Sequence, residues 1–149
     1  MAERVWPDAY RGIITEDQIA YMLDWMYSPR RIVEEISERG IHYRWIESSG
    51  TRSGFVGYGP LGSGEPCELH KFYLDRDHHG TGLASAAMAL LWEDIFESGV
   101  SELRLRVNRN NRRAIRFYEK HEFIIEREDC LDIGGGFVMD DYLMVRSCH

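Results

Sequence analysis

The stretch of sequence that decides the fold is residues 79–84, His79-Gly80-Thr81-Gly82-Leu83-Ala84. It lies between a strand-like run, Glu68 to Leu74, and an apolar segment that ends near Ser98. A glycine-rich turn between a strand and a helix directs backbone N–H groups and the helix dipole to one point, which suits a phosphate. A helix-capping turn that binds nothing has the same composition, so a second signal is needed.

The second signal is the segment VNRNNRRAIRFYEKHEF, which begins at Val107 and ends at Phe123. Its central part reads as a helix from Asn111 to Lys120. This helix can return across the same sheet and bring Tyr118 toward the glycine turn. We therefore expect one pocket that holds a pyrophosphate-bearing cofactor beside a proton donor.

Composition and charge narrow the class of protein. With 149 residues, 44% of them hydrophobic, the chain is expected to form a single domain over 1–149. The net charge of −7 repels nucleic acid and anionic lipid, which argues against both as partners. The longest apolar stretch, Leu83 to Phe96, is too short and too polar to span a membrane. No secretory leader pattern opens the chain.

The cysteines argue against a metal centre. Cys67, Cys130 and Cys148 are far apart and form no CxxC pair. This spacing fits neither a zinc site nor a disulfide framework, so we expect no metal. Free thiols fit a reducing compartment, and the expected location is the cytoplasm.

The remaining pattern alternates between helical and strand-like segments. Thr15 is an N-cap signal with Gln18 three positions on, and Ser28-Pro29 restarts a helix that Gly40 closes. Short aromatic or β-branched runs predict strands at 41–47, 54–58, 68–74, 102–107, 123–130 and 142–145, with a turn at Gly134-Gly135-Gly136 between the last two. This order predicts a mixed α/β sheet with helices on both faces.

The two segments, in this order and at this separation, resemble the GNAT superfamily of N-acetyltransferases. Gly82 and Ala84 match the family's cofactor motif, whereas His79 stands where Gln or Arg is usual. The second segment matches as Asn111-x-x-Ala114-x-x-Phe117-Tyr118-Glu119-Lys120, with Glu122 where glycine is usual. More narrowly, YRGIITEDQIAYMLDWMYSP and IGGGFVMDDYLMV resemble the PaiA-like spermidine/spermine acetyltransferase branch.

The resemblance implies a GNAT-type α/β fold, with a mixed, mostly antiparallel central sheet and helices on both faces. Family members usually begin with a strand and half a helix upstream of the segment that is here AERVWPDAYRGII. The first strand is therefore expected to be missing, either because the fold lacks it or because the chain's start is displaced.

The resemblance also implies a site for acetyl-CoA (CoA). In this fold the strand before the glycine turn diverges from its neighbour, so backbone groups of Phe72 and Leu74 can pair with the pantetheine arm. The expected pyrophosphate cradle is formed by the amides of Gly80, Thr81, Gly82, Leu83 and Ala84. His79 is a weaker cation for phosphate than arginine, and Arg76 or His78 are alternatives. A solvated turn histidine is the competing interpretation.

Tyr118 matches the family's tyrosine that protonates the departing thiolate. A phenol with a pKa near 10 carries its proton at neutral pH and can act as this general acid. The competing interpretation is a packing aromatic beside Phe117. Asn111 is expected to bond the pantetheine or to cap its helix.

The candidates for the general base are Glu68 and His70, which lie two apart and so on one face of a strand. Amine attack on a thioester needs a neutral nucleophile, so a base must accept a proton. Glu68 stands where some relatives carry a glutamate base, and a surface role is equally open for both. A backbone N–H near Leu74 would bind the oxyanion. Because no cysteine falls in either motif, we expect direct transfer in a ternary complex.

Aromatic and acidic residues of the first helix, Tyr21, Asp24, Trp25 and Tyr27, are candidates for the acceptor site. Carboxylates and ring faces suit a polyamine or another cationic amine, although core packing is the more common role of such aromatics. The residues Asp140-Asp141-Tyr142 add charge there or form a turn.

The leading hypothesis is an acetyl-CoA-dependent N-acetyltransferase for a small primary amine, with a polyamine as one candidate. A protein N-terminus or lysine is an alternative acceptor. A non-catalytic acetyl-CoA sensor is an alternative of a different class, which the histidine at position 79 favours and Tyr118 opposes. Relatives commonly dimerise, so the resemblance leaves a homodimer open.

Overall fold

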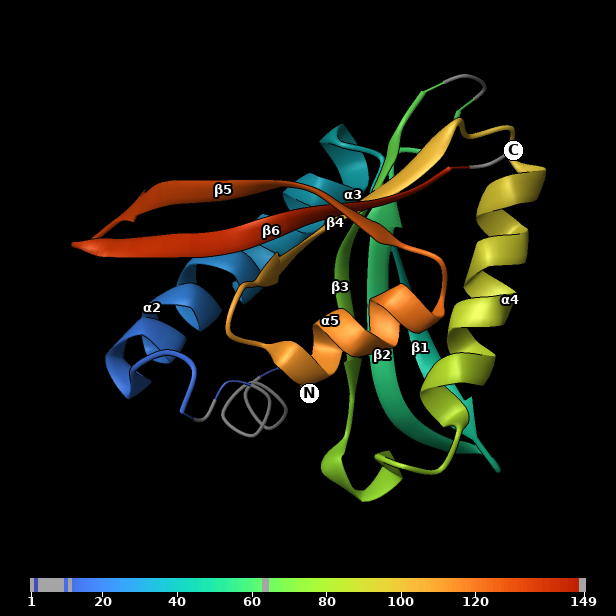
Figure 1. The fold of residues 1–149 in the computed structure, drawn as a ribbon, viewed down its shortest axis with the longest axis horizontal. Helices are drawn as coiled ribbons and strands as arrows, with labels where there is room; N and C mark the ends of the chain where they lie inside the picture. Colours follow the sequence, from blue (N-terminus) through green and yellow to red (C-terminus); the bar gives the residue numbers. More distant parts are fainter. Residues whose placement is uncertain (1, 3–9, 11, 63–64, 148–149) are drawn as a thin grey trace.

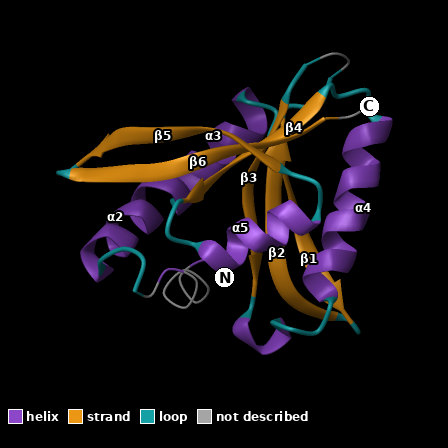
Figure 2. Cartoon of the chain, viewed as in Figure 1, coloured by secondary structure: helices purple, strands orange, loops and turns teal. Residues whose placement is uncertain are grey.

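The computed structural model describes residues 2, 10, 12–62 and 65–147. Within this part a six-stranded sheet runs in the order β1-β2-β3-β4-β6-β5 (Figures 1 and 2). The strands are β1 (His42–Ser48), β2 (Thr51–Gly59), β3 (Cys67–Leu74), β4 (Glu102–Asn108), β5 (Ile124–Gly134) and β6 (Phe137–Ser147). The helices are α2 (Glu16–Tyr27), α3 (Pro29–Glu38), α4 (Leu83–Glu97) and α5 (Arg112–Lys120), with a 3₁₀ turn η1 (Arg76–His78).

The helix starts follow from their capping residues. The Thr15 hydroxyl accepts the N–H of Gln18 at 3.1 Å at the start of α2. Ser28 caps α3, which begins with Pro29, and the Asn111 side chain accepts the N–H of Ala114 at 3.3 Å on α5. These bonds satisfy N–H groups that have no partner inside the helix. The predicted starts of these helices are confirmed.

Helices cover both faces of the sheet. Residues Leu69, Leu103, Leu105 and Met144 form a buried core with α4 and α5. On the opposite face, Tyr73, Ile133 and Met139 pack against α2. Figure 1 shows α5 in front of β3 and β2, and the β5–β6 hairpin extending away above α2. The predicted mixed α/β sheet with helices on both faces is confirmed.

The last two strands are longer than the sequence predicts. The predicted strands 123–130 and 142–145 are 124–134 and 137–147 in the structure, joined at the glycine turn 134–136. Asp140-Asp141-Tyr142 is therefore inside β6, and its interpretation as a turn was wrong. Acidic residues suggest a turn, but here the segment pairs with β4 and β5, and its carboxylates form ion pairs, Asp141 with Arg106 and Asp140 with Arg109.

The site depends on how β3 leaves its neighbour β4. These two strands are parallel and pair only from Cys67 to Leu69 with Leu103 to Leu105. On the other side of β3, Tyr58 lies opposite Leu69 and Gly57 opposite Lys71. His70 is therefore the extra residue of a β-bulge, and such a bulge bends its strand. The bulge and the divergence of β3 from β4 begin at the same residue.

The predicted loss of a first strand concerns the chain upstream of the segment 2–14, and much of that segment (residues 3–9 and 11) lies outside the described residues. In the described sheet β1 is one edge strand and β5 the other. None of the helices in 12–62 and 65–147 has the length and apolar character that crossing a membrane requires.

Candidate active site

A cavity of about 570 Å³ fills the wedge between β3 and β4. Its walls come from the divergent half of β3, the end of β4, the turn before α4 and the first turns of α5. Of the predicted cofactor residues it is lined by Phe72, Leu74, His79, Gly80, Gly82, Ala84, Asn111 and Tyr118. The structure thus brings the two sequence segments together in one cavity, as the sequence predicts.

The turn before α4 leaves room for a ligand. Gly80 and Gly82 have φ of +76° and +83°, a left-handed conformation that glycine adopts without strain. A Cβ atom at either position would meet nothing within 4 Å, so the space over the turn is open. The Thr81 hydroxyl donates to the carbonyl of His78 at 2.6 Å and closes the turn. Leu83 packs against the core, so only its backbone can take the predicted role.

His79 stabilises the turn from within. Its Nε2 lies 3.1 Å from the carbonyl oxygen of Leu74 and donates to it in the matching tautomer. This contact ties the end of β3 to the start of the glycine turn. One ring nitrogen of His79 is therefore engaged by the protein, which leaves less of the side chain for a phosphate.

The charge of the cavity is opposite to that of the chain. Although the net charge is −7, no Asp or Glu of the described residues lines this cavity. Its charged side chains are Arg106, Arg113 and Lys120, joined by three histidines. Arg113 and Lys120 come from α5 and form no ion pair within residues 12–62 and 65–147. Such a cavity suits an anionic ligand.

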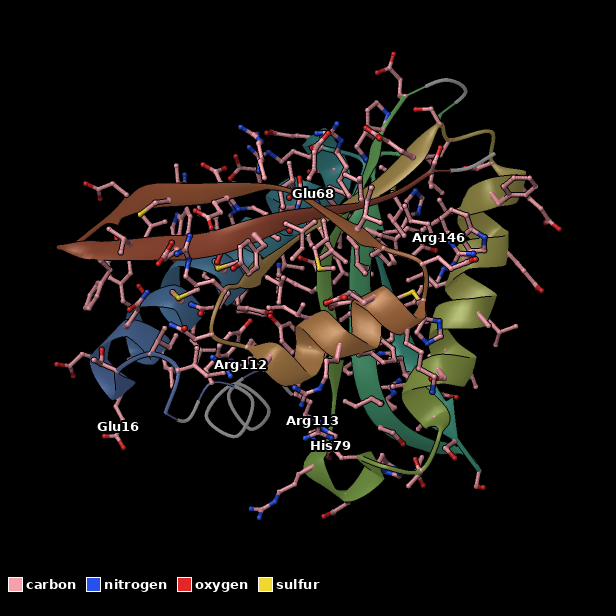
Figure 3. All side chains as sticks on the ribbon, in the orientation of Figure 1. Glu16, Glu68, His79, Arg112, Arg113 and Arg146 are labelled. Atoms are coloured by element: carbon pink, nitrogen blue, oxygen red, sulfur yellow. The ribbon has the colours of Figure 1, made fainter. Side chains whose placement is uncertain are left out.

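Arg113 and Lys120 were missed by the sequence reasoning. The signal was available, since α5 carries four basic residues and one acidic residue. Figure 3 shows Arg113 below α5, on the side of the helix where His79 lies, and Arg112 nearer the start of the helix. Both Arg113 and His79 line the cavity and Arg112 does not.

Three phenols meet at the inner end of the cavity. The hydroxyls of Tyr10 and Tyr73 are 2.9 Å apart, and Tyr118 lines the same space. Burial raises the pKa of Tyr10 to about 12. Burial also raises the pKa of Tyr118, so its phenol stays protonated at neutral pH. The ring of Tyr118 packs edge-on against Phe123, with ring centroids 5.6 Å apart.

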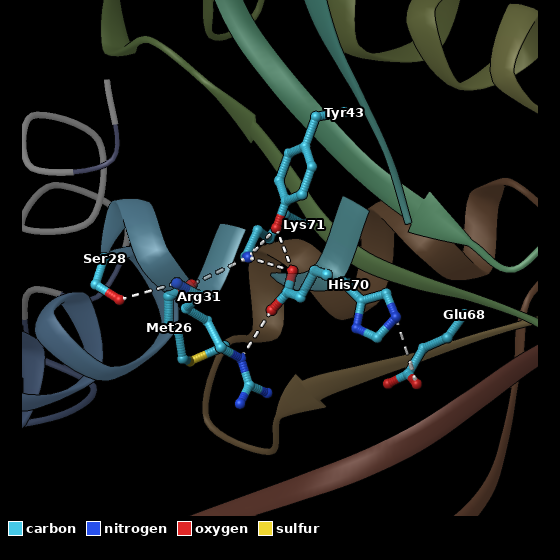
Figure 4. A network of polar contacts seen from close by, with 8 residues as sticks. Met26, Ser28, Arg31, Tyr43, Glu68, His70 and Lys71 are labelled. Carbon is cyan, nitrogen blue, oxygen red and sulfur yellow. Dashed lines mark hydrogen bonds and ion pairs between the residues drawn. The ribbon is translucent and has the colours of Figure 1, made fainter. Parts of the chain in front are cut away.

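His70 connects this cavity to a smaller one. The second cavity, of about 330 Å³, is lined by His70, Glu68, Arg39 and Arg104. The Nε2 atom of His70 lies 3.8 Å from Oε2 of Glu68 (Figure 4). Burial lowers the pKa of His70, while the Glu68 carboxylate opposes this shift. His70 is thus a neutral imidazole at pH 7 with a carboxylate on its far side, and only His70 of this pair reaches the larger cavity.

A buried ionic network lies directly behind the bulge (Figure 4). The Nζ of Lys71 donates to Oε2 of Glu35 at 3.3 Å and also bonds the Tyr43 hydroxyl. It donates to the carbonyl of Met26 at the end of α2, also at 3.3 Å. Lys71 is 2% exposed and Glu35 5%. Burial alone raises the pKa of Glu35, but the Tyr43 hydroxyl, Lys71 and Arg31 outweigh this and lower it.

The predicted acceptor residues of α2 lie apart from the cavity. The Tyr21 hydroxyl donates to the carbonyl of Ile133 at 2.8 Å, and the Tyr27 ring packs edge-on against Phe55. Asp24 and Trp25 are exposed on the outer side of the helix. None of the four lines the wedge cavity.

The cavity wall on β4 instead carries Arg106, which the sequence reasoning also missed. Its guanidinium binds Asp129 at 2.7 Å and Asp141 at 3.2 Å. Its Nη2 is buried without a hydrogen-bond partner among the described residues. The alternating pattern of β4 places Arg104 and Arg106 on one face. The two carboxylates reach Arg106 only through the register of β6 against β4, which places Asp141, and of β5 against β6, which places Asp129.

A divergent pair of parallel strands, an open glycine turn and a buried phenol together define an acyl-transferring enzyme that binds a phosphate-bearing cofactor. The model of the acetyltransferase (GNAT) family matches residues 5–123, most of the chain. The chain belongs to this family, and the protein is an N-acetyltransferase that uses acetyl-CoA.

Individual relatives agree with this assignment. An uncharacterized N-acetyltransferase of Mycobacterium tuberculosis is 32% identical over 149 residues, which covers 99% of this chain and 93% of that protein. The spermidine N(1)-acetyltransferase of Thermoplasma acidophilum is 25% identical over 144 residues, 94% of this chain and 86% of that protein. The crystal structure of the PaiA N-acetyltransferase of Thermoplasma acidophilum with coenzyme A superimposes with a TM-score of 0.78 at 23% identity, over 98% of this chain and 87% of that one.

Proposed function

We propose that the protein transfers the acetyl group of acetyl-CoA directly to a small primary amine within a ternary complex. The observation that carries this proposal is the wedge between β3 and β4, which reaches from the glycine turn to the phenols of Tyr10 and Tyr73. A thioester that enters from the turn side would have its carbonyl carbon beside His70 and Tyr118. The amine would reach the same carbon from the inner end.

Each group has one task in this reaction. The amine nitrogen attacks the thioester carbon, and the tetrahedral oxyanion is bound by a backbone N–H of β3 near Leu74. The C–S bond then breaks, and Tyr118 donates its proton to the leaving thiolate. His70, neutral at pH 7, accepts the proton that the amine nitrogen loses, and Glu68 stabilises the imidazolium.

The cofactor is held by backbone and by charge. We infer that the amides of residues 80–84 bind the pyrophosphate and that the free edge of β3 at Phe72 and Leu74 pairs with the pantetheine arm. Asn111 uses its side-chain oxygen to cap α5, which leaves its amide nitrogen for the ligand. Arg113 and Lys120 provide positive charge at the wall of the cavity.

Polyamines are the finer candidate for the acceptor. The support is the similarity to the spermidine N(1)-acetyltransferase of Thermoplasma acidophilum. Within the described residues, the wedge cavity offers no carboxylate to a polycation. Amines that carry no second positive charge, such as simple monoamines, are therefore tested in parallel.

The proposal is tested by thiol release from acetyl-CoA against a panel of amines that contains spermidine, simple monoamines, amino acids and a short peptide. Turnover with one or more small amines supports it. Turnover with the peptide alone would assign a protein acceptor instead. Tight cofactor binding without turnover on any amine would favour a sensor.

The pH dependence of turnover discriminates between the two candidate bases. If His70 is the base, the acid limb of kcat/KM lies below about 6.5, because burial lowers the pKa of this imidazole. Replacement Glu68→Gln removes the charge that raises the pKa, so the limb should move to lower pH with activity retained. Replacement His70→Gln should reduce kcat/KM and flatten this limb. Loss of activity in Glu68→Gln with retention in His70→Gln would assign the base to Glu68.

Cofactor affinity tests the cations of α5. Replacement Arg113→Ala should weaken acetyl-CoA binding about tenfold, through loss of one hydrogen bond to a charged group. The matched control is Arg112→Ala, an adjacent exposed arginine outside the cavity, which should change affinity less than twofold. Acetyl-pantetheine lacks the phosphates, so its KM should be the same in both variants. An equal loss with acetyl-pantetheine would contradict the phosphate role of Arg113.

A further inference from the structure

The buried cation Lys71 follows immediately after the extra residue of the β3 bulge. Because His70 is inserted, the alternation of side chains changes at this point. Leu69, Phe72 and Leu74 face the core below α4 and α5, whereas Lys71 and Tyr73 face α2 and α3. Lys71 therefore faces α2 and α3 only while His70 is the extra residue of the bulge.

Lys71 joins β3 to three other elements. It donates to the Met26 carbonyl at the end of α2, to Glu35 of α3 and to Tyr43 of β1. Its Nζ also lies 4.5 Å from the ring centroid of Tyr27 and 4.8 Å from that of Tyr43. A cation with so many partners in a buried place holds its strand in one register, because a shift of one residue would leave the charge unpaired.

We propose that Lys71 is a positioning residue that fixes the bulge at His70 and thereby the divergence of β3 from β4. Pairing of these strands stops at Leu69, and the anchor acts two residues further on. Through these contacts Lys71 holds β3 against α2 and α3 on one face of the sheet. The edge of β3 that points to β4 then stays unpaired beyond Leu69, beside the wedge. Lys71 also holds the end of α2, at the Met26 carbonyl, on the same strand. This inference rests on the proposed function for its catalytic consequence.

The expected consequence is a change in kcat with little change in cofactor affinity. The phosphates are bound by the turn before α4 and by α5, which the anchor does not touch. The thioester carbon, His70 and the oxyanion-binding backbone of β3 depend on the bulge. Displacement of reacting groups by about 1 Å can lower a rate about a hundredfold.

The test uses the double variant Lys71→Met/Glu35→Leu, which removes both charges and keeps apolar volume. We expect kcat to fall at least about tenfold, with CoA affinity within about threefold of wild type. The matched control is Arg31→Met. Arg31 binds the other oxygen of Glu35 at 3.0 Å and has no contact with Lys71 among the described hydrogen bonds, so kcat should stay within about twofold.

Amide hydrogen exchange of residues 69–75 gives a readout that needs no substrate. Faster exchange in the double variant, and not in Arg31→Met, is expected because β3 loses its anchor. If the double variant does not fold, Tyr43→Phe deletes one partner of Lys71 and should give the same changes on a smaller scale. Wild-type kcat together with wild-type exchange in the folded double variant would overturn the proposal. Faster amide exchange in the double variant, combined with no turnover of any amine by the wild type, would support Lys71 as a positioning residue and contradict the proposed function.

Discussion

Replacement Tyr118→Phe should lower kcat by about 10²- to 10⁴-fold, the usual contribution of a general acid. Without the phenolic proton the thiolate must leave unprotonated, so the loss appears in the step that breaks the C–S bond. KM for acetyl-CoA should change little, because the ring and its packing against Phe123 remain. Steady-state thiol release with the best amine of the panel measures both parameters.

The matched control for this prediction is a second phenol of the same cavity. The hydroxyl of Tyr118 has no hydrogen-bond partner among the described residues, so Tyr118→Phe should unfold at the wild-type temperature. Tyr73→Phe removes a hydroxyl that bonds Tyr10 and has no proton-transfer role in the proposed reaction. If Tyr73→Phe lowered kcat as much as Tyr118→Phe, the polarity of the cavity, rather than one proton donor, would control the rate.

Replacement Glu35→Leu should lower the free energy of unfolding by about 3–5 kcal/mol, the typical result of leaving a buried charge without its partner. Lys71 would remain 2% exposed with only neutral acceptors around it. Urea denaturation followed by circular dichroism measures the loss. Lys71→Met should also destabilise, since it leaves the Glu35 carboxylate in the same apolar surroundings.

The double variant Glu35→Leu/Lys71→Met separates the ion pair from the packing around it. A buried pair replaced by apolar residues of similar volume is often neutral in stability, so the double variant should be more stable than either single variant. If the loss of unfolding free energy in the double variant equalled the sum of the losses in the two single variants, the two charges would act independently.

The pH dependence of stability follows from the same carboxylate. The pKa of Glu35 is lowered in the folded state, so its contribution is complete above the unfolded value of about 4.3 and disappears as pH falls below it. Wild-type stability should therefore decline more steeply in this range than the stability of Glu35→Leu. Parallel curves would exclude Glu35 as a source of acid sensitivity.

Much of the fold could be predicted because its signals are local. Thr15, Ser28-Pro29 and Asn111 cap the helices that their sequence patterns predict. The glycine turn before α4 and the position of Tyr118 depend on a few adjacent residues and on the order of elements. These two features are enough to predict the cavity.

The rest depends on contacts between distant residues. The bulge at His70 is defined by pairing with β2, and no property of Leu69, His70 and Lys71 alone indicates where the register shifts. Lys71 meets Glu35 from 36 residues away, and Tyr10 meets Tyr73 from 63 residues away. The surroundings of the aromatic residues on α2 depend on such contacts too, since the Tyr21 hydroxyl donates to the carbonyl of Ile133 in the distant hairpin.

The two-faced sheet also has a consequence for divergence between relatives. In the proposed reaction, α4, α5 and the turn before α4 bind the donor on one face of the sheet, while α2 packs on the opposite face. Strand β3 contributes side chains to both faces. Substitutions on α2 can therefore change this face of the sheet without altering the residues that line the wedge cavity. A substitution at Lys71 or Glu35 would affect the packing on both faces of the sheet, because Lys71 lies on β3. We expect natural variation among homologues to be broad on α2 and narrow at this pair.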